Sequence, residues 1–315
     1  MEMIFENAFL LSSTTQCQNF QSESTRWNGE ITRELTRLDS FEAGIKYWDS
    51  VPASVNGVLG GFGEATTVPK QDAISSRLLL LSLFPQLSLI VPPHLAQASA
   101  TPDTTHNTAS TPSRRSYRAL DAGAGIGRIS STVLLPLFDR VELVEPCEQF
   151  IRKAVEDATK AERDGWKLLR ADNPTSEVAK EGRNLKGVRF WQTGLQFFDP
   201  ATPGLSTTNN PIPLLATVPP SAADSTPSSS AISWPNPNEP HDMGDGYDVC
   251  FLQWCLGHLS NEELTAFLIR CKASLRRTGE TVEGYIIVKE NICKNSAGPG
   301  KIGEIFDTED SSITR

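Results

Sequence analysis

The feature that most constrains the fold is a glycine-rich turn that directly follows an apolar segment, in the run ALDAGAGIGRI at 119–129. The apolar segment ends in Asp121, and Gly123, Gly125 and Gly127 follow at alternate positions. Glycine permits backbone angles closed to other residues and lets a ligand approach the main chain. The first turn of a following helix offers free N–H groups. The run therefore predicts a strand, a nucleotide-binding turn and a helix.

Strand and helix signals alternate along the rest of the chain. The segment 247–253 is apolar on both faces, as in a buried parallel strand. The alternation predicts a Rossmann-like α/β fold with a mostly parallel sheet and flanking helices. The expected strands are 117–121, 141–144, 188–193, 247–253 and 285–289, and the expected helices are 23–48, 72–84 (capped by Asp72), 126–138 (ended or kinked by Pro136), 149–155 and 262–275.

Residues near the turn favour one cofactor. A dinucleotide site would have glycine where Arg128 stands. A cation there suits a ligand with a carboxylate, such as S-adenosylmethionine (AdoMet). Glu145 ends the next strand, 22 residues after Gly123, where an acidic side chain can accept both ribose hydroxyl protons. Gly194 and Leu195 follow the third strand and suit an adenine. NAD is the alternative ligand.

The composition of three long stretches predicts insertions into a single domain. The stretch 201–246 holds nine prolines and no Lys or Arg, so it is not expected to contribute to a core. Residues 51–63 hold four glycines and a proline and predict no regular element. The expected organisation is a disordered N-terminus (1–22) and a domain (23–315) made of a helical extension and lid (23–91), inserted loops (92–116, 157–187, 201–246) and the sheet.

Charge and cysteine usage exclude several kinds of partner. The net charge of −9 argues against non-specific nucleic-acid binding. The six cysteines form no C-x-x-C pair, and the four histidines are scattered, so no zinc site is expected. The N-terminus lacks the basic start of a signal peptide, and the apolar run 78–91 is too short to span a bilayer. We therefore expect a cytoplasmic or nuclear protein without metal or membrane partners.

Several segments together resemble the eukaryotic protein N-terminal (α-N) methyltransferases. The LGG segment and QWCLGHL are far more specific than the glycine turn, which many methyltransferases share. The matching segments are YWDSVPASVNGVLGGFG (47–63), ALDAGAGIGRIS (119–130), LLPLF (134–138), TGLQFF (193–198), FLQWCLGHLSNEEL (251–264), RCKASLRRTG (270–279), IIVKEN (286–291) and DTEDSSITR (307–315).

The resemblance implies a class I AdoMet-dependent methyltransferase that acts on the α-amino group of proteins beginning Xaa-Pro-Lys or Xaa-Pro-Arg. It implies that Asp310 and His258 accept or relay the amine proton and that Asn291 holds the amine. Asp307 would recognise the basic third residue of the peptide. The implied cofactor contacts are Gly123, Arg128, Glu145, Leu195 and Gln253, and the implied peptide channel adds Trp48, Leu59, Gly60, Trp254 and Ser312.

The sequence departs from the family pattern in two ways. Glu145 and Glu290 stand where aspartate is usual, and the family continues past DSSITR with a helix and two closing strands. We therefore expect a C-terminally truncated chain in which 285–289 lies near an open sheet edge, with weak activity. The alternatives are a methyltransferase of the same fold acting on a small molecule, and an inactive truncated binding protein.

Overall fold

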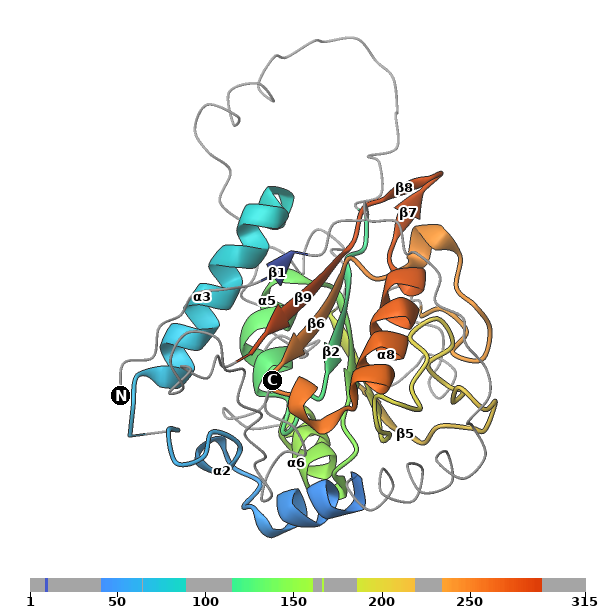
Figure 1. Cartoon of the computed structure of the whole chain (residues 1–315). Helices are drawn as coiled ribbons and strands as arrows, with labels where there is room; N and C mark the ends of the chain where they lie inside the picture. The colour runs from blue at the N-terminus through green and yellow to red at the C-terminus, as the bar shows by residue number, and fades with distance from the viewer. Residues whose placement is uncertain are drawn as a thin grey trace, which may run out of the picture.

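The computed structural model describes residues 9–10, 41–63, 65–88, 115–160, 166, 186–218 and 234–290. Its centre is a seven-stranded sheet in the order β1-β9-β6-β2-β3-β4-β5 (Figure 1). The five inner strands are parallel, and the outer strands β1 and β5 are antiparallel to their neighbours. The strands are β1 (Phe9–Leu10), β2 (Arg118–Ala122), β3 (Arg140–Val144), β4 (Gly187–Trp191), β5 (Leu214–Val218), β6 (Val249–Gln253) and β9 (Tyr285–Lys289), with a separate pair β7 (Arg277–Thr278) and β8 (Thr281–Val282).

Helices connect the strands and cover both faces of the sheet. Residues 41–50 are helical, and α8 begins with a capping box in which Ser260 and Glu263 bond each other's backbone N–H. The other helices are α2 (Val55–Val58), α3 (Val68–Leu83), η1 (Pro85–Leu87), the π-helical turn η3 (Ser130–Leu134), α5 (Leu135–Leu137), α6 (Glu148–Thr159), η6 (Met243–Asp245), η7 (Leu256–His258) and α8 (Asn261–Ser274).

Alternate residues of each inner strand enter two different cores. Ala119, Val141 and Phe190 pack with residues of α3, α5 and α6 on one face. Leu120 and Trp191 are among those that pack with α8 on the other, and the two layers lie on opposite sides of the sheet in Figure 1. A strand places successive side chains on opposite faces, so strands buried along their whole length need this double cover. The predicted parallel α/β fold is confirmed.

The order of the strands also determines where a ligand can bind. The chain runs from β2 to β3 and β4 on one side, and β6 and β9 lie on the other side of β2. In open α/β sheets, ligands bind outside the carboxyl ends of the strands at the point where the strand order reverses. The glycine turn follows β2 at this point.

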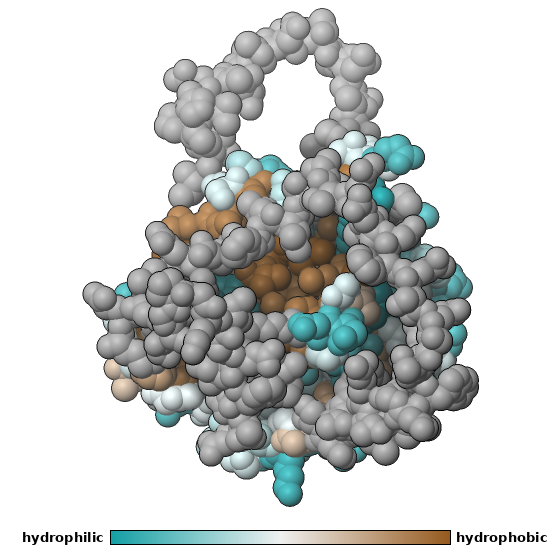
Figure 2. Space-filling model, in the orientation of Figure 1, coloured by the Kyte–Doolittle hydropathy of each residue, from teal (hydrophilic) through white to brown (hydrophobic). Residues whose placement is uncertain are grey.

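Helix α3 has an unusual distribution of side chains. Its buried residues are Val68, Asp72, Ser76 and Leu80, which are spaced four apart and form one row. Apolar residues lie on its outer side, and Figure 2 shows brown surface in this region. Leu78 is 63% exposed there. Asp72 lies within the helix, which begins at Val68, so the predicted cap at Asp72 is wrong.

The expectation that 201–246 contributes nothing to the core is wrong. Residues 214–218 form β5, which pairs antiparallel with β4, and Ile212 and Val218 are buried. Trp234 lies against the guanidinium of Arg189, 4.6 Å from ring centre to Cζ. The nine prolines argued against regular structure in this segment. A short strand at a sheet edge nevertheless tolerates flanking prolines.

Part of the predicted disordered N-terminus is a strand. In β1, Phe9 pairs with Val288 and Leu10 with Ile287, so β9 has a neighbour along these residues. The expected open edge at 285–289 is therefore wrong for this part of the strand. The rest of 1–22 lies outside the described residues.

Smaller differences concern individual turns. The segment expected to have no regular element contains the single turn α2, which Ser54 caps by accepting from the N–H of Gly57 at 3.1 Å. Pro136 lies in the first turn of α5, and the helix ends at Leu137, as predicted from the proline. Within the expected insertion 157–187, Trp166 packs on Phe190 with ring centres 5.7 Å apart.

Candidate active site

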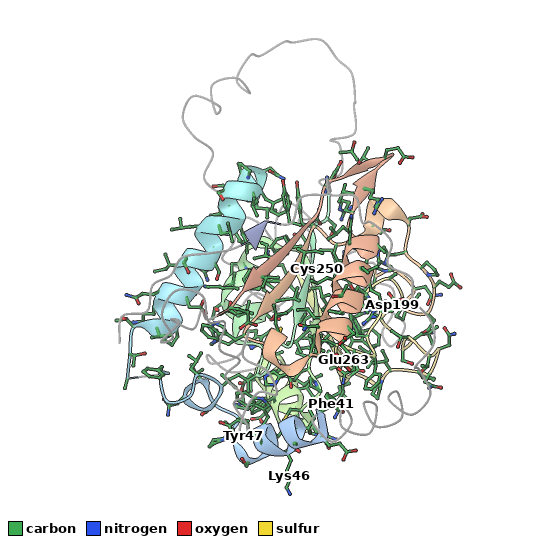
Figure 3. The ribbon with its side chains drawn as sticks, in the orientation of Figure 1. Phe41, Lys46, Tyr47, Asp199, Cys250 and Glu263 are labelled. Carbon is green, nitrogen blue, oxygen red and sulfur yellow. The ribbon has the colours of Figure 1, made fainter. Side chains whose placement is uncertain are left out.

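A cavity of about 350 Å³ opens at the carboxyl ends of the parallel strands. This volume is in the usual range for a small-molecule site. The helix 41–50 covers it, with Phe41, Ile45 and Trp48 in the lining. In Figure 3 the side chain of Lys46 on the same helix extends away from the molecule. We call this helix the lid.

The glycine turn forms one wall of the cavity and needs its glycines. Gly123 has a φ of 68° and Gly127 a φ of 74°, in the left-handed region that favours glycine. A Cβ on Gly123 would lie 2.5 Å from Cβ of Cys255, and one on Gly127 would lie 2.5 Å from the Trp166 ring. The turn thus presents bare backbone to the cavity on one side and packs tightly on the other.

Two buried carboxylates face the cavity beside the turn. Glu145 accepts hydrogen bonds from the N–H groups of Gly125 at 2.8 Å and Cys147 at 2.9 Å. Burial raises the pKa of Glu145 to about 7, against these two hydrogen bonds, which lower it. Burial also raises the pKa of Asp121 to about 6, although it accepts from the Ser130 hydroxyl at 2.7 Å. Both groups are therefore close to titration at neutral pH.

Arg128 and Gln253 lie on the side of the cavity next to α3. Nη1 of Arg128 is 2.6 Å from Oδ2 of Asp72, and its guanidinium lies 5.3 Å from the centre of the Trp254 ring. Nε2 of Gln253 donates to both oxygens of Asp72 at 2.9 and 3.0 Å. These bonds leave the remaining guanidinium donors and Oε1 of Gln253 for other partners.

Another part of the cavity wall is aromatic and is formed by Trp48, Trp254 and His258. The ring of His258 meets that of Trp48 edge to face, with centres 5.9 Å apart. Burial lowers the pKa of His258, so its imidazole is neutral at pH 7 and can accept a proton. Trp254 has a φ of 55°, which is strained for a residue with a large side chain. Such strain occurs where a side chain must be held in one place.

Three contacts hold the lid and the chain after it against the first residues of α6. Nε2 of Gln149 donates to the carbonyl oxygens of Trp48 at 2.6 Å and Val51 at 2.9 Å. Sγ of Cys147 lies 3.1 Å from Oδ1 of Asp49. Cys147 also donates its backbone N–H to the carboxylate of Glu145. The lid is therefore linked to Glu145 through Cys147.

The structure brings most of the predicted site residues together. The cavity is lined by all six predicted cofactor residues and by Trp48, Leu59, Trp254 and His258. Gly60, with a φ of 56°, is exposed and not in the lining. The predictions for Asn291, Asp307, Asp310 and Ser312 lie outside the described residues.

Sequence analysis missed several residues of the site. Phe41, Phe150 and Cys147 line the cavity, and Asp72 binds two lining side chains. The lining apolar residues resemble ordinary core positions in the sequence. Asp72 gave no local signal either, because its neighbours Lys70, Gln71, Ser75, Ser76 and Arg77 are polar as well.

Other kinds of site are not found in the part of the chain that the structure describes. Its His, Cys, Asp and Glu side chains form no group of three suited to a metal ion. No helix in these ranges is long and apolar enough to cross a membrane. The cavity at the glycine turn is the candidate functional site.

Comparison with known proteins identifies a family. The model of a family described as AdoMet dependent proline di-methyltransferase matches residues 36–91, 102–173 and 237–315. These ranges make up most of the chain and include the lid, the glycine turn and the aromatic wall.

Individual proteins are similar to this chain over most of its length. The chain is 28% identical over 300 residues to alpha N-terminal protein methyltransferase 1 of Arabidopsis thaliana, covering 95% of this chain and 74% of the relative. It is 29% identical over 269 residues to N-terminal Xaa-Pro-Lys N-methyltransferase 1 of Homo sapiens, covering 85% and 75%. A solved SAM-dependent methyltransferase from Leishmania major superposes with a TM-score of 0.45 and 22% identity, covering 88% of this chain and 68% of that one.

Proposed function

Because this chain belongs to the family of AdoMet-dependent proline di-methyltransferases, we propose that it methylates the α-amino group of proteins beginning Xaa-Pro-Lys or Xaa-Pro-Arg. The relatives from Xenopus laevis and Homo sapiens are N-terminal Xaa-Pro-Lys N-methyltransferases. The observation that carries the proposal is that the glycine turn and the aromatic wall with His258 line one cavity. A cofactor and an amine can therefore meet in it.

The residues around the turn fit AdoMet. The cofactor supplies an activated methyl group on a positively charged sulfur. Glu145 is placed to accept from ribose hydroxyls, and Arg128 has guanidinium donors left for a carboxylate. Leu195 offers an apolar surface to the adenine, and the bare backbone at Gly123 permits close approach.

The aromatic wall with Trp48, Trp254 and His258 fits a small amine in an apolar channel. A free α-amine has a pKa of about 8, so it must lose a proton before it can attack a methyl group. His258 is half-buried and neutral, and it lies on the lid side of the cavity against Trp48. We assign it the role of accepting or relaying that proton. The aromatic rings exclude water and hold the N-terminal residues in line with the methyl group.

The direct test is mass spectrometry of peptides incubated with the protein and isotopically labelled AdoMet. Peptides beginning Ala-Pro-Lys and Ser-Pro-Lys should gain methyl groups on the α-amine, and the same peptides with an acetylated N-terminus should gain none. Replacing the peptide lysine by glutamate should abolish turnover. Equal methylation of lysine and glutamate peptides, or labelling only of small molecules, would refute the proposed substrate.

The role of His258 can be tested with a matched variant. His258→Gln should lower kcat by about 10²–10⁴-fold, the usual contribution of a general base. His241→Gln is the control, because His241 is also half-buried but bonds the carbonyl of Ser274 and does not line the cavity. If both variants lose activity equally, or neither does, His258 has no special role in proton transfer.

A further inference from the structure

The inward-facing row of α3 contains two polar residues where apolar ones would stabilise the fold. Asp72 is 0% and Ser76 2% exposed, between the apolar Val68 and Leu80. On the same helix Ile74 is 59% exposed. Burying a carboxylate is costly unless it is paired and hydrogen-bonded. A helix that buries an aspartate and exposes an isoleucine therefore needs a reason other than packing.

Asp72 bonds the side chains of three different segments. It accepts from Arg128 at 2.6 Å, from Gln253 at 2.9 and 3.0 Å, and from Lys289 of β9. Burial alone would raise the pKa of Asp72, but these two cations and the amide lower it on balance. The carboxylate is thus ionised, and two of its three partners line the cavity.

An ionised carboxylate also fixes which way the Gln253 amide points. It can only accept hydrogen bonds, so it selects the NH₂ group of the amide and turns Oε1 away. Oε1 is buried and has no hydrogen-bond partner among the described atoms. Gln253 is 7% exposed and lines the cavity. Buried acceptors are normally hydrogen-bonded, so we expect Oε1 of Gln253 to accept from a donor on the bound ligand.

We infer that Asp72 is a positioning residue for the amino-acid end of the cofactor: it holds Arg128 as donor to the carboxylate and turns Oε1 of Gln253 toward the ammonium. One carboxylate thereby gives the site opposite polarity at two neighbouring points. The inference rests on the cofactor of the proposed function and not on its peptide substrate.

The competing explanation is that Asp72 only anchors α3 to the sheet. Lys289 supports this reading, because its ammonium also bonds Ser75 at 3.1 Å and Ser76 at 2.9 Å. Ser76 therefore provides a matched control. Its side chain contacts Lys289 from the same row of α3, and it does not line the cavity.

The experiment compares two ligands by calorimetry. AdoMet carries the amino-acid end, and 5′-methylthioadenosine keeps the adenosine but lacks that end. Asp72→Asn preserves size, removes the charge and lets the amide of Gln253 reverse. AdoMet affinity should fall by about tenfold or more, as expected for lost charge-assisted hydrogen bonds, and methylthioadenosine affinity by less than about twofold. Ser76→Ala should change neither affinity by more than about twofold.

Equal losses for both ligands, unchanged AdoMet affinity, or the same loss of preference in Ser76→Ala would each overturn the inference. If Asp72→Asn does not fold, a double variant with Asp72→Asn and Lys289→Leu removes both charges of the Asp72–Lys289 ion pair. It is compared with Lys289→Leu alone. The double variant should lose the preference for AdoMet that the single variant keeps, and equal preferences would overturn the inference. Wild-type protein that binds AdoMet but methylates no peptide would refute the proposed function and leave this test intact.

Discussion

Strands β2 and β3 differ between their two ends in whether buried charges are paired. Toward the amino end, Arg118, the first residue of β2, forms an ion pair of 2.8 Å with Glu142 in the middle of β3, and the two side chains are 1% and 0% exposed. At their carboxyl ends, Asp121 and Glu145 are buried without an ion pair in the described part of the chain, and burial raises their pKa values. In these two strands, the charges toward the amino end are paired within the protein, whereas the two carboxylates at the carboxyl end are left for a ligand.

The amino end is closed by the segment 201–246, which the sequence did not predict to contribute to a core. The carbonyl oxygen of Asp245 accepts from Arg118 at 3.1 Å, and that of Pro235 accepts from Arg189 at 3.2 Å. Asp248, at the start of β6, accepts two bonds from Arg276 at 2.9 and 3.2 Å. The comparison indicates that charges at the amino end serve stability and charges at the carboxyl end serve binding.

The largest expected effect comes from replacing 201–246 with a short Gly-Ser linker. This change removes β5, exposes surface now covered by Ile212 and Val218, and takes acceptors from two buried arginines. Burial of each apolar side chain is worth about 1.5–3 kcal/mol, and each arginine left unsatisfied costs about 1–3 kcal/mol or more. We expect a loss of at least about 5 kcal/mol in the free energy of unfolding, measured with urea. A loss below about 1 kcal/mol would show that the segment does not close the amino end.

Glu142→Gln should have the next largest effect on stability. It leaves Arg118 buried without its counter-ion, and breaking a buried pair in this way costs about 3–5 kcal/mol. Glu283→Gln is the control, because Glu283 pairs with the 38% exposed Arg115 and should cost less than about 1 kcal/mol. Similar urea midpoints for the two variants would remove the distinction between buried and surface charge at this end.

At the carboxyl end, Glu145→Gln should affect AdoMet binding more than the free energy of unfolding. The free energy of AdoMet binding should weaken by about 1–3 kcal/mol, because a charged acceptor is lost. Stability at pH 8 should fall less than in Glu142→Gln: one of the two backbone N–H groups loses its acceptor, but removing a charged form that burial penalises offsets part of this cost. Calorimetry and thermal melting measure the two quantities. Loss of stability with unchanged affinity would place Glu145 with the structural charges.

The smallest expected effect is the pH dependence of AdoMet binding. The pKa of Glu145 in the free site is about 7, and its ionised form is the better acceptor for ribose hydroxyls. Affinity should therefore rise with pH between 6 and 8, by less than about 1.4 kcal/mol per pH unit. In Glu145→Gln the slope should become shallower, leaving the part due to Asp121. A slope that is the same in wild type and variant would exclude Glu145 as its source.

The sequence predicted the elements in which one local pattern decides the outcome. The glycine turn, Glu145 after the next strand, and the apolar runs of β6 and β9 were each found within a residue or two. In all of them a buried parallel strand requires a continuous apolar run, and close ligand approach requires glycine. The family resemblance added the aromatic wall, which no local pattern identifies.

The elements that sequence analysis missed depend on pairing between distant segments. β5 is a strand because β4 lies beside it, and β1 because β9 does. Asp72 gains its environment from Arg128 and Gln253, which belong to other elements. Composition averaged over a segment cannot reveal such contacts, since a few buried side chains are enough to order it.

The pairing of β1 with β9 has a consequence for how the chain acquires its structure. It joins the first tenth of the sequence to the last tenth, so among the strand pairs that the structure describes it closes the longest loop. During synthesis, the N-terminal segment leaves the ribosome first and must wait for β9 before it can pair. Contacts of such high sequence separation form slowly. We therefore expect this strand pair to form late and to be the first part of the sheet to exchange its amide hydrogens with solvent.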